Sequence, residues 1–371
     1  MKSLIIIFTS LTISYLSCDY LYSMKKKSYK ANIFSDDCIK NSIEYGYEYH
    51  PNKKCRYKRV EKNHLEYDNI FYTNNFGFVS DLNYQLEKQS DEKRAVVLGY
   101  SMAEGNYLKI NWPTKATMLA DSNIQFYNFA RAGYFNLNLY NIYFDIVSKF
   151  SFDYLFLPTL GKTDKQFMIF QKRVDGIYDG LFTNAPRDQN DFDVNFHQKM
   201  SHMYTFFNSE EPEPYLNQFN ITSQNYVLLK NHVNKLFSER VATDPLGKHD
   251  TSLISEYQNS HFYQDFGERN INIFFAIISH ALKKGAKVVF YQDPKKGKHP
   301  SEEKKDSTYS FYRWLKEKHP EEIFYLDGND FFKKYTKKEY NDFFFRYDGH
   351  WNQTGSDIFA KGASSFLKKI Q

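Results

Sequence analysis

Features that would point to a function at once are scarce in this chain of 371 residues. Cysteine occurs only three times, and no Cys or His spacing matches a structural zinc site. Charge is nearly balanced, with 49 Lys and Arg against 44 Asp and Glu, and the lysines are spread along the chain. A nucleic-acid-binding arm would concentrate one sign of charge, so the composition argues against nucleic acid as a partner.

Long apolar runs are also rare, and the clearest one lies at the amino terminus. Met1 and Lys2 precede a largely apolar stretch that reaches Cys18. A basic start with an apolar core of this length predicts a secretory signal or a short uncleaved anchor over residues 1–18. It is marginal for a membrane-spanning helix, which needs roughly 20 residues. The sequence Tyr15-Leu16-Ser17-Cys18 also resembles a bacterial lipoprotein cleavage site. Each interpretation places the body of the protein in the periplasm or cell envelope.

The cysteine count agrees with export. If Cys18 is removed with a signal or acylated, Cys38 and Cys55 remain as one candidate disulfide pair. Closing a loop of that size would stabilise the folded state by about 3 kcal/mol in the chain-entropy model. Two unpaired thiols fit the sequence equally well.

Aromatic residues, in contrast, are abundant. Phe, Tyr and Trp make up 19% of the chain. Aromatic core packing explains this, and so does an aromatic platform for sugars or acyl chains. The composition leaves both open.

The chain divides into a polar lead-in and a longer repeating part. Residues 19–90 predict short strands and turns, around 45–52 and 72–78, and carry no chemistry of their own. From residue 91 to 371 strands and helices alternate, which predicts a three-layer α/β/α sandwich with a central parallel sheet. The expected strands are 95–99, 124–129, 154–157, 287–291 and 323–326, and the expected helices are 112–120, 137–148, 271–284, 307–317 and 354–368. Residues 165–270 do not fit this repeat and follow the third strand, so we expect them to form a cap insertion.

A serine follows the first buried strand of the repeat. Gly99 ends the apolar run of that strand, and Ser101 comes at once on a turn closed by Gly105. Open α/β sheets place their chemistry at the carboxyl ends of strands, and a hydroxyl on a tight strand-to-helix turn suits a nucleophile. Turn and N-cap serines are far more common, so Ser101 needs a base before it counts as catalytic.

A base occurs near the carboxyl terminus. Asp348 and His350 stand two residues apart in a compact polar turn before the last expected helix. An extended segment would project both side chains the same way, so the carboxylate can hold one ring nitrogen while the other faces a nucleophile. The other histidines of the chain lack this setting. An Asp-His pair that only stabilises the turn fits the sequence equally well, so Ser101, His350 and Asp348 are at this point candidate members of a catalytic triad.

The order of these motifs resembles the SGNH (GDSL-like) hydrolase superfamily. Gly99-Tyr100-Ser101 matches the first block, with Tyr100 in place of the usual Asp, and Asn128 to Gly133 matches the second. Gly161-Lys162-Thr163-Asp164 matches the third block, with Thr163 in place of Asn, and Asp348-Gly349-His350 matches the last. The match covers roughly residues 95–165 and 270–370, and the final block is most like envelope-associated members that act on acylated polysaccharides.

The resemblance implies a flavodoxin-like fold and an exported carboxylic ester hydrolase that needs no cofactor and no metal. Its nucleophile would be Ser101, and the oxyanion hole would comprise Ser101, Gly133 and Thr163. The implied substrate is an acylated small molecule or carbohydrate, and the implied acyl group is acetyl. Two alternatives remain open: an O-acyltransferase that uses the same triad on envelope polysaccharide, and an inactive carbohydrate-binding envelope protein.

Overall fold

The computed structural model describes residues 30–35, 38–42, 46–62, 64–120, 123–134, 136–159, 256–261, 268–301 and 308–371. The predicted signal or anchor at 1–18 and most of the predicted cap at 165–270 lie outside these residues. Among the described helices, none combines the length and the apolar character that crossing a bilayer requires.

Five parallel strands form the central sheet. They are β6 (Lys93–Val97), β7 (Ile124–Asn128), β8 (Tyr154–Pro158), β9 (Lys287–Gln292) and β10 (Ile323–Asp327). Their spatial order is β7-β6-β8-β9-β10, the flavodoxin-like order, so the chain reverses direction across the sheet beside β6. The segment after β6 therefore leaves the sheet at its switch point, where doubly wound folds bind ligands.

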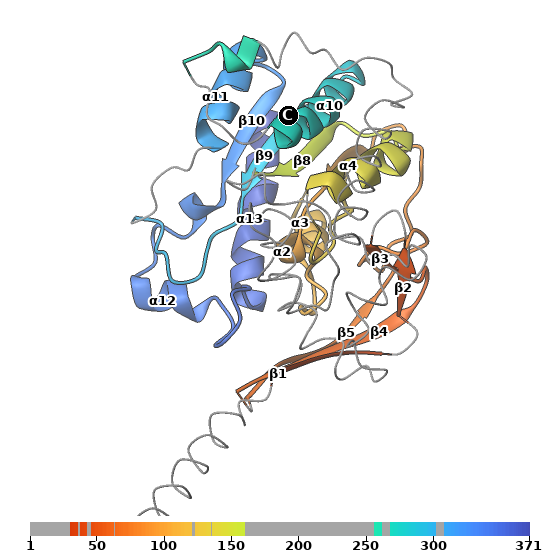
Figure 1. The fold of residues 1–371 in the computed structure, drawn as a ribbon, viewed down its shortest axis with the longest axis vertical. Coiled ribbons are helices and arrows are strands. Elements are labelled where there is room, and N and C mark those ends of the chain that lie inside the picture. The colour runs from red at the N-terminus through yellow and green to blue at the C-terminus, as the bar shows by residue number, and fades with distance from the viewer. Residues whose placement is uncertain are drawn as a thin grey trace, which may run out of the picture.

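Helices cover both faces of this sheet. On one face, α3 (Trp112–Leu119) packs against α13 (Gln353–Ile370). On the other face, α4 (Asn136–Asp145) packs against α10 (Glu268–Lys283), and α11 (Thr308–Lys318) lies beside β10. Alternate residues of β6 serve the two cores: Ala95 and Val97 join the α3 side, and Val96 joins the α4 side. The predicted three-layer α/β/α sandwich is confirmed (Figure 1).

The predicted helices and strands of this domain are present, with small shifts at their ends. Strand β6 covers Lys93–Val97 rather than 95–99, and α10 begins at Glu268 rather than at residue 271. The helix predicted over 137–148 differs as much at its carboxyl end. That helix ends at Asp145, and a separate 3-10 turn, η1 (Val147–Lys149), follows it. The short elements η2 (Gly328–Phe331) and α12 (Lys337–Asp342) fill the stretch between β10 and α13.

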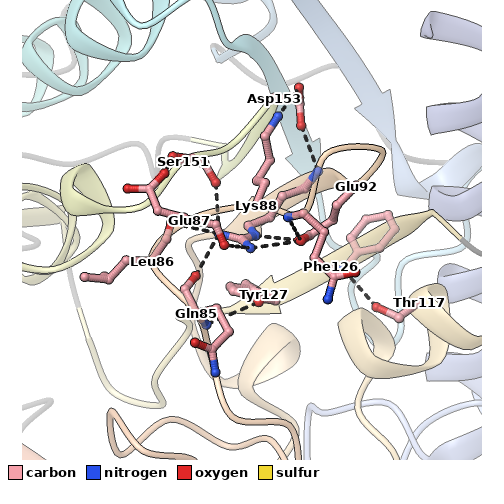
Figure 2. A network of polar contacts seen from close by, with 12 residues as sticks. Gln85, Leu86, Glu87, Lys88, Glu92, Thr117, Phe126, Tyr127, Ser151 and Asp153 are labelled. Atoms are coloured by element: carbon pink, nitrogen blue, oxygen red, sulfur yellow. Dashed lines mark hydrogen bonds and ion pairs between the residues drawn. The ribbon is translucent and has the colours of Figure 1, made fainter.

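A buried arginine anchors the amino end of β6. The Arg94 side chain is fully buried, and its Nε and Nη2 atoms donate to the two Glu92 carboxylate oxygens at 2.7 and 3.1 Å. Its Nη1 donates to the carbonyls of Gln85, Leu86 and Ser151. Figure 2 shows this network around the 85–92 segment. Because the buried Arg94 charge has its partner in Glu92, β6 can begin with polar residues. A search for apolar runs does not detect such a start.

The lead-in forms a sheet of its own, with longer strands than the sequence predicts. The N-terminal sheet consists of β1 (Lys30–Phe34), β4 (Lys54–Glu61) and β5 (His64–Tyr72) in the antiparallel order β1-β4-β5, and β2 (Ile39–Ser42) pairs with β3 (Gly46–Tyr49) beside it. Figure 1 shows these strands in red and orange at the lower right, below the parallel sheet. Inward-facing Tyr57, Tyr67 and Phe71 belong to the same core as α3 and α13, so the lead-in is packed onto the α/β domain.

A disulfide bond joins Cys38 to Cys55. Their Cα atoms lie 5.7 Å apart, and both side chains are buried. The sequence leaves open either a disulfide or two unpaired thiols, and the structure contains the disulfide. The bond ties the residue before β2 to strand β4.

Replacing both cysteines by serine should lower the free energy of unfolding by about 3 kcal/mol, because the unfolded chain regains the entropy of the open loop. Urea unfolding of wild type and the Cys38→Ser/Cys55→Ser variant measures this difference. Reduced wild-type protein should match the variant. Equal stability of oxidised and reduced wild-type protein would contradict a native bond.

Two buried ionisable side chains lie near each other where the N-terminal segment packs on the α/β domain. Glu104 ends α2 (Ser101–Glu104) and is fully buried, and Arg131 is buried near it among the rings of Tyr47, Tyr49 and Tyr134. Burial raises the pKa of Glu104 to about 7, although the positive charge of Arg131 opposes the rise. The carboxyl group therefore loses its proton far less readily in the folded state than in the unfolded chain.

This difference predicts how stability depends on pH. Since the folded-state pKa of Glu104 is raised, its contribution is present below its ordinary pKa of 4.5 and is lost as pH rises to about 7. The Glu104→Gln variant keeps a neutral side chain, so its stability relative to wild type should rise by about 3 kcal/mol between pH 4.5 and 7.5. Urea unfolding across this pH range measures the effect. The exposed Glu321→Gln substitution is the matched control, and a Glu104→Gln difference as flat as that control would contradict the prediction.

Candidate active site

Ser101 is the first residue of α2 and follows β6 after three residues. Gly99 precedes it in a crowded position, because a Cβ there would lie 2.2 Å from the Tyr291 hydroxyl, which donates to the Leu98 carbonyl at 2.8 Å. Gly105 ends the turn in the left-handed region with φ of 61°. The Asn128 side chain donates to the Ala103 carbonyl at 2.8 Å. These contacts fix the turn that presents Ser101.

The structure brings Ser101, His350 and Asp348 together. His350 Nε2 lies 2.6 Å from Ser101 Oγ, and His350 Nδ1 lies 2.7 Å from Asp348 Oδ1. The serine and the histidine come from positions 249 residues apart in the sequence. The His350 side chain is 24% exposed, whereas Asp348 is 5% exposed. This is a hydrogen-bonded chain from a hydroxyl to a buried carboxylate, with solvent access at the hydroxyl end.

The Asp348 carboxylate is ionised despite its burial. Burial raises its pKa, but the hydrogen bonds and charge of His350 and the charge of Arg59 outweigh this and hold the pKa well below its usual range. Arg59 Nη1 lies 3.1 Å from Asp348 Oδ2, and the Tyr67 hydroxyl donates to the same oxygen at 3.2 Å. A carboxylate in this state stabilises an imidazolium at His350.

Backbone contacts hold the loop that carries Asp348 and His350. Lys296 Nζ donates to the carbonyls of Phe345, Arg346 and Asp348 at 2.5, 2.6 and 3.2 Å. The Phe345 amide donates to the His350 carbonyl at 3.0 Å. Trp351 is fully buried beneath the loop and packs on Phe359 of α13. The loop is therefore fixed on both sides of the histidine.

The backbone after β7 contacts the turn that precedes Ser101. Gly133 follows β7 in the left-handed region with φ of 70°, and the neighbouring Arg131 amide donates to the Gly99 carbonyl at 3.2 Å. Within the described residues, the Ser101 and Gly133 amides have no hydrogen-bond acceptor. Thr163, the third predicted member of the oxyanion hole, lies outside the described residues, as do Gly161, Lys162 and Asp164.

The substituted residue of the first family block has a structural partner. The Tyr100 hydroxyl donates to Asn136 Oδ1 of α4 at 2.6 Å. Burial raises the pKa of this phenol, so it remains protonated. Tyr100 therefore links the turn that carries Ser101 to helix α4. As a neutral phenol it adds no negative charge to the site.

Sequence reasoning missed the residues that the lead-in contributes. The lead-in was expected to carry no chemistry, yet Arg59 of β4 and Tyr67 of β5 contact the Asp348 carboxylate. Tyr47 of β3 also donates to the Ala132 carbonyl at 2.6 Å, next to Gly133. The available signal is the alternation in β4, which turns Arg59 to the inner face together with Tyr57.

No metal centre is found within the part of the chain that the structure describes, because no three His, Cys, Asp or Glu side chains there are grouped as ligands. The described chemistry of the site is that of a hydroxyl, an imidazole and a carboxylate.

No family model and no curated protein matches the chain. Among solved structures, it is similar to a protein from Bacillus subtilis, with 12% identity over 92% of this chain and 77% of the other, at a TM-score of 0.39. It is also similar to a GDSL-like lipase from Bacteroides thetaiotaomicron, with 10% identity over 76% of this chain and 91% of the other, at a TM-score of 0.35. A third is a carbohydrate esterase family 2 enzyme with a carbohydrate-binding domain from Corynascus thermopiles (Myceliophthora fergusii), with 8% identity over 92% of this chain and 87% of the other, at a TM-score of 0.32.

Acylhydrolases and GDSL-like lipases recur among these similar structures. Likeness at this level does not bear on activity, which has to be derived from the geometry of the chain's own site.

Proposed function

We propose that the protein is an exported serine esterase that removes an acyl group, acetyl in particular, from an ester carried by a carbohydrate. The observation that carries this proposal is the continuous hydrogen-bonded chain from Ser101 through His350 to Asp348. The serine stands at the switch point of a doubly wound sheet, where ligands bind.

The proposed reaction begins with proton transfer. His350 Nε2 takes the Ser101 proton as Oγ attacks the ester carbonyl, and Asp348 stabilises the imidazolium that forms. The amides of Ser101 and Gly133 bind the negative oxygen of the tetrahedral intermediate, with Thr163 as the third donor. His350 then protonates the departing alcohol, which leaves an acyl group on Ser101. Water, activated by the same histidine, releases the acid and restores the serine.

Three observations support export and the choice of substrate. The disulfide between Cys38 and Cys55 fits an oxidising compartment. The basic and apolar start of the chain fits a signal or anchor, with Cys18 as a candidate lipoprotein site. The sequence Asp348-Gly349-His350-Trp351-Asn352 resembles envelope-associated members of the superfamily that act on acylated polysaccharides.

Removing the proposed nucleophile should abolish hydrolysis. Ser101→Ala is expected to lower kcat on p-nitrophenyl acetate by at least about 10⁴-fold, because no other group replaces the attacking oxygen. Its thermal unfolding should match that of wild type. Ser151→Ala is the matched control, since Ser151 bonds Glu87 at the opposite end of the sheet, and it should keep wild-type activity. An active Ser101→Ala variant would overturn the proposal.

A serine-directed probe separates an enzyme from a binding protein. A fluorophosphonate probe should label wild type at Ser101, and a binding protein without an active serine would remain unlabelled.

The fate of the acyl group separates hydrolysis from transfer. With an acetylated donor and a xylo-oligosaccharide acceptor, the proposed esterase should release free acetate. Mass spectrometry would detect acetylated acceptor if a sugar hydroxyl replaced water.

A further inference from the structure

The two oxygens of the Asp348 carboxylate have different partners. Oδ1 lies 2.7 Å from His350 Nδ1, on the side of the proposed reaction. Oδ2 lies 3.1 Å from Arg59 Nη1 and accepts from the Tyr67 hydroxyl at 3.2 Å. A carboxylate bound through both oxygens cannot rotate without breaking a contact on the far side. Its orientation toward His350 therefore depends on Arg59 and Tyr67.

Both of these residues come from the N-terminal sheet and are themselves held in place. The Arg59 side chain is 10% exposed, and its Nη2 donates to Glu61 Oε2 at 2.6 Å. The Tyr67 hydroxyl lies 3.1 Å from the Tyr57 hydroxyl, and the Tyr67 ring packs against Tyr107, which in turn contacts the His350 ring. The contact to Asp348 is thus part of a packed arrangement and not an isolated surface ion pair.

Strand β4 offers a second arginine for comparison. Arg56 forms a two-point hydrogen bond to Asp68 at 2.7 and 2.6 Å, and its side chain is 61% exposed. Arg56 and Arg59 thus belong to the same strand and each has a carboxylate partner. Only Arg59 contacts the proposed triad.

We propose that Arg59 and Tyr67 are positioning residues of the active site, which hold the Asp348 carboxylate in the orientation that His350 requires. Neither residue contacts Ser101. The N-terminal sheet is accordingly a working part of the active site, although it lies outside the region of family resemblance. This inference rests on the proposed esterase function and adds to it the source of the triad's orientation.

The proposal distinguishes a charge effect from a hydrogen-bond effect. Around the Asp348–His350 pair lie Arg59 with Glu61 from β4, Tyr57 and Tyr67 from the N-terminal sheet, Tyr107 from the α2–α3 loop, and Lys296 from the loop after β9. The buried carboxyl groups of Asp293 and Glu104 act on Tyr107 and are common to wild type and every variant below. Glu66 accepts from the Tyr347 amide on the same loop as Asp348. Losing the Arg59 charge leaves the carboxylate less compensated, which favours protonated His350. Losing the Tyr67 hydroxyl changes no charge.

Kinetics of the full-length protein on p-nitrophenyl acetate test these roles. Arg59→Met should lower kcat by about 10²-fold, because the carboxylate loses its orientation, while KM stays unchanged. The acid limb of its pH–rate profile should move to higher pH by about one unit. Arg59→Lys should keep the wild-type acid limb and recover part of kcat, since it retains the charge but not the planar fork. Tyr67→Phe should lower kcat without moving the limb.

Arg56→Met is the matched control and should leave kcat and the acid limb as in wild type. Circular dichroism melts of each variant show whether it is folded. A purely structural role for Arg59 would lower the yield of folded protein but leave the acid limb of the folded fraction unmoved. That result, or the same limb shift in Arg56→Met, would overturn the proposal.

A measurement that needs no turnover separates this inference from the proposed function. In protein labelled with ¹⁵N-histidine, the His350 resonance is identified by its loss in His350→Gln, and its titration midpoint is followed by NMR. Arg59→Met should raise this midpoint, and Arg56→Met should not. If wild type hydrolyses no ester but the midpoint moves, the esterase function fails and the coupling of Arg59 to the pair stands. If wild type is an esterase and the midpoint does not move, the role of Arg59 fails alone.

Discussion

A negative charge held out of water is the constraint on which this site depends. Asp348 is 5% exposed and ionised, so it requires positive or hydrogen-bonding partners in the folded state. It finds them in separate parts of the chain: His350 in its own loop, and Arg59 and Tyr67 in the N-terminal sheet. Removing one partner from a buried ion pair typically costs about 3–5 kcal/mol, because the other charge is left uncompensated. The Asp348 carboxylate therefore joins its own loop to the N-terminal sheet, in addition to the apolar core that the sheet shares with the α/β domain.

The N-terminal segment also contacts the chain around Gly133. Tyr47 donates to the Ala132 carbonyl, and Arg131 donates to the Tyr47 carbonyl at 3.2 Å and to the Gly77 carbonyl at 2.8 Å. These bonds fix the backbone around Gly133 from outside the α/β domain. The lead-in thus contacts both the Asp348 carboxylate and the backbone next to Gly133. An α/β domain with only the family blocks would lack both supports.

Local patterns predicted the α/β domain, and the three central side chains were predicted from the order of the motifs together with the family resemblance. Short apolar strands separated by amphipathic helices predicted the parallel sheet, and the spacing of Asp348 and His350 predicted their common direction. The geometry of the triad agrees with that expectation, while the catalytic roles of the three residues stay predictions. Arg59 and Tyr67 could not be found in this way, because Tyr67 and Asp348 are 281 residues apart and their contact depends on how two sheets pack. Charged Lys54, Arg56 and Lys58 on the outer face of β4 also hid the length of that strand. The cysteine pairing remained open for the same reason, since it depends on the distance between β2 and β4.

The sequence separation of the site's parts has a consequence for when the site can form. A chain synthesised from its amino terminus presents Arg59 and Ser101 well before His350. Contacts between such distant positions form late in folding, because the long intervening loop must close first. The Ser101 hydroxyl therefore gains its hydrogen bond to His350 only when both ends of the α/β domain have folded. The arrangement of the site is coupled to completion of that domain, and a chain that stops before residue 350 holds Ser101 without its histidine partner.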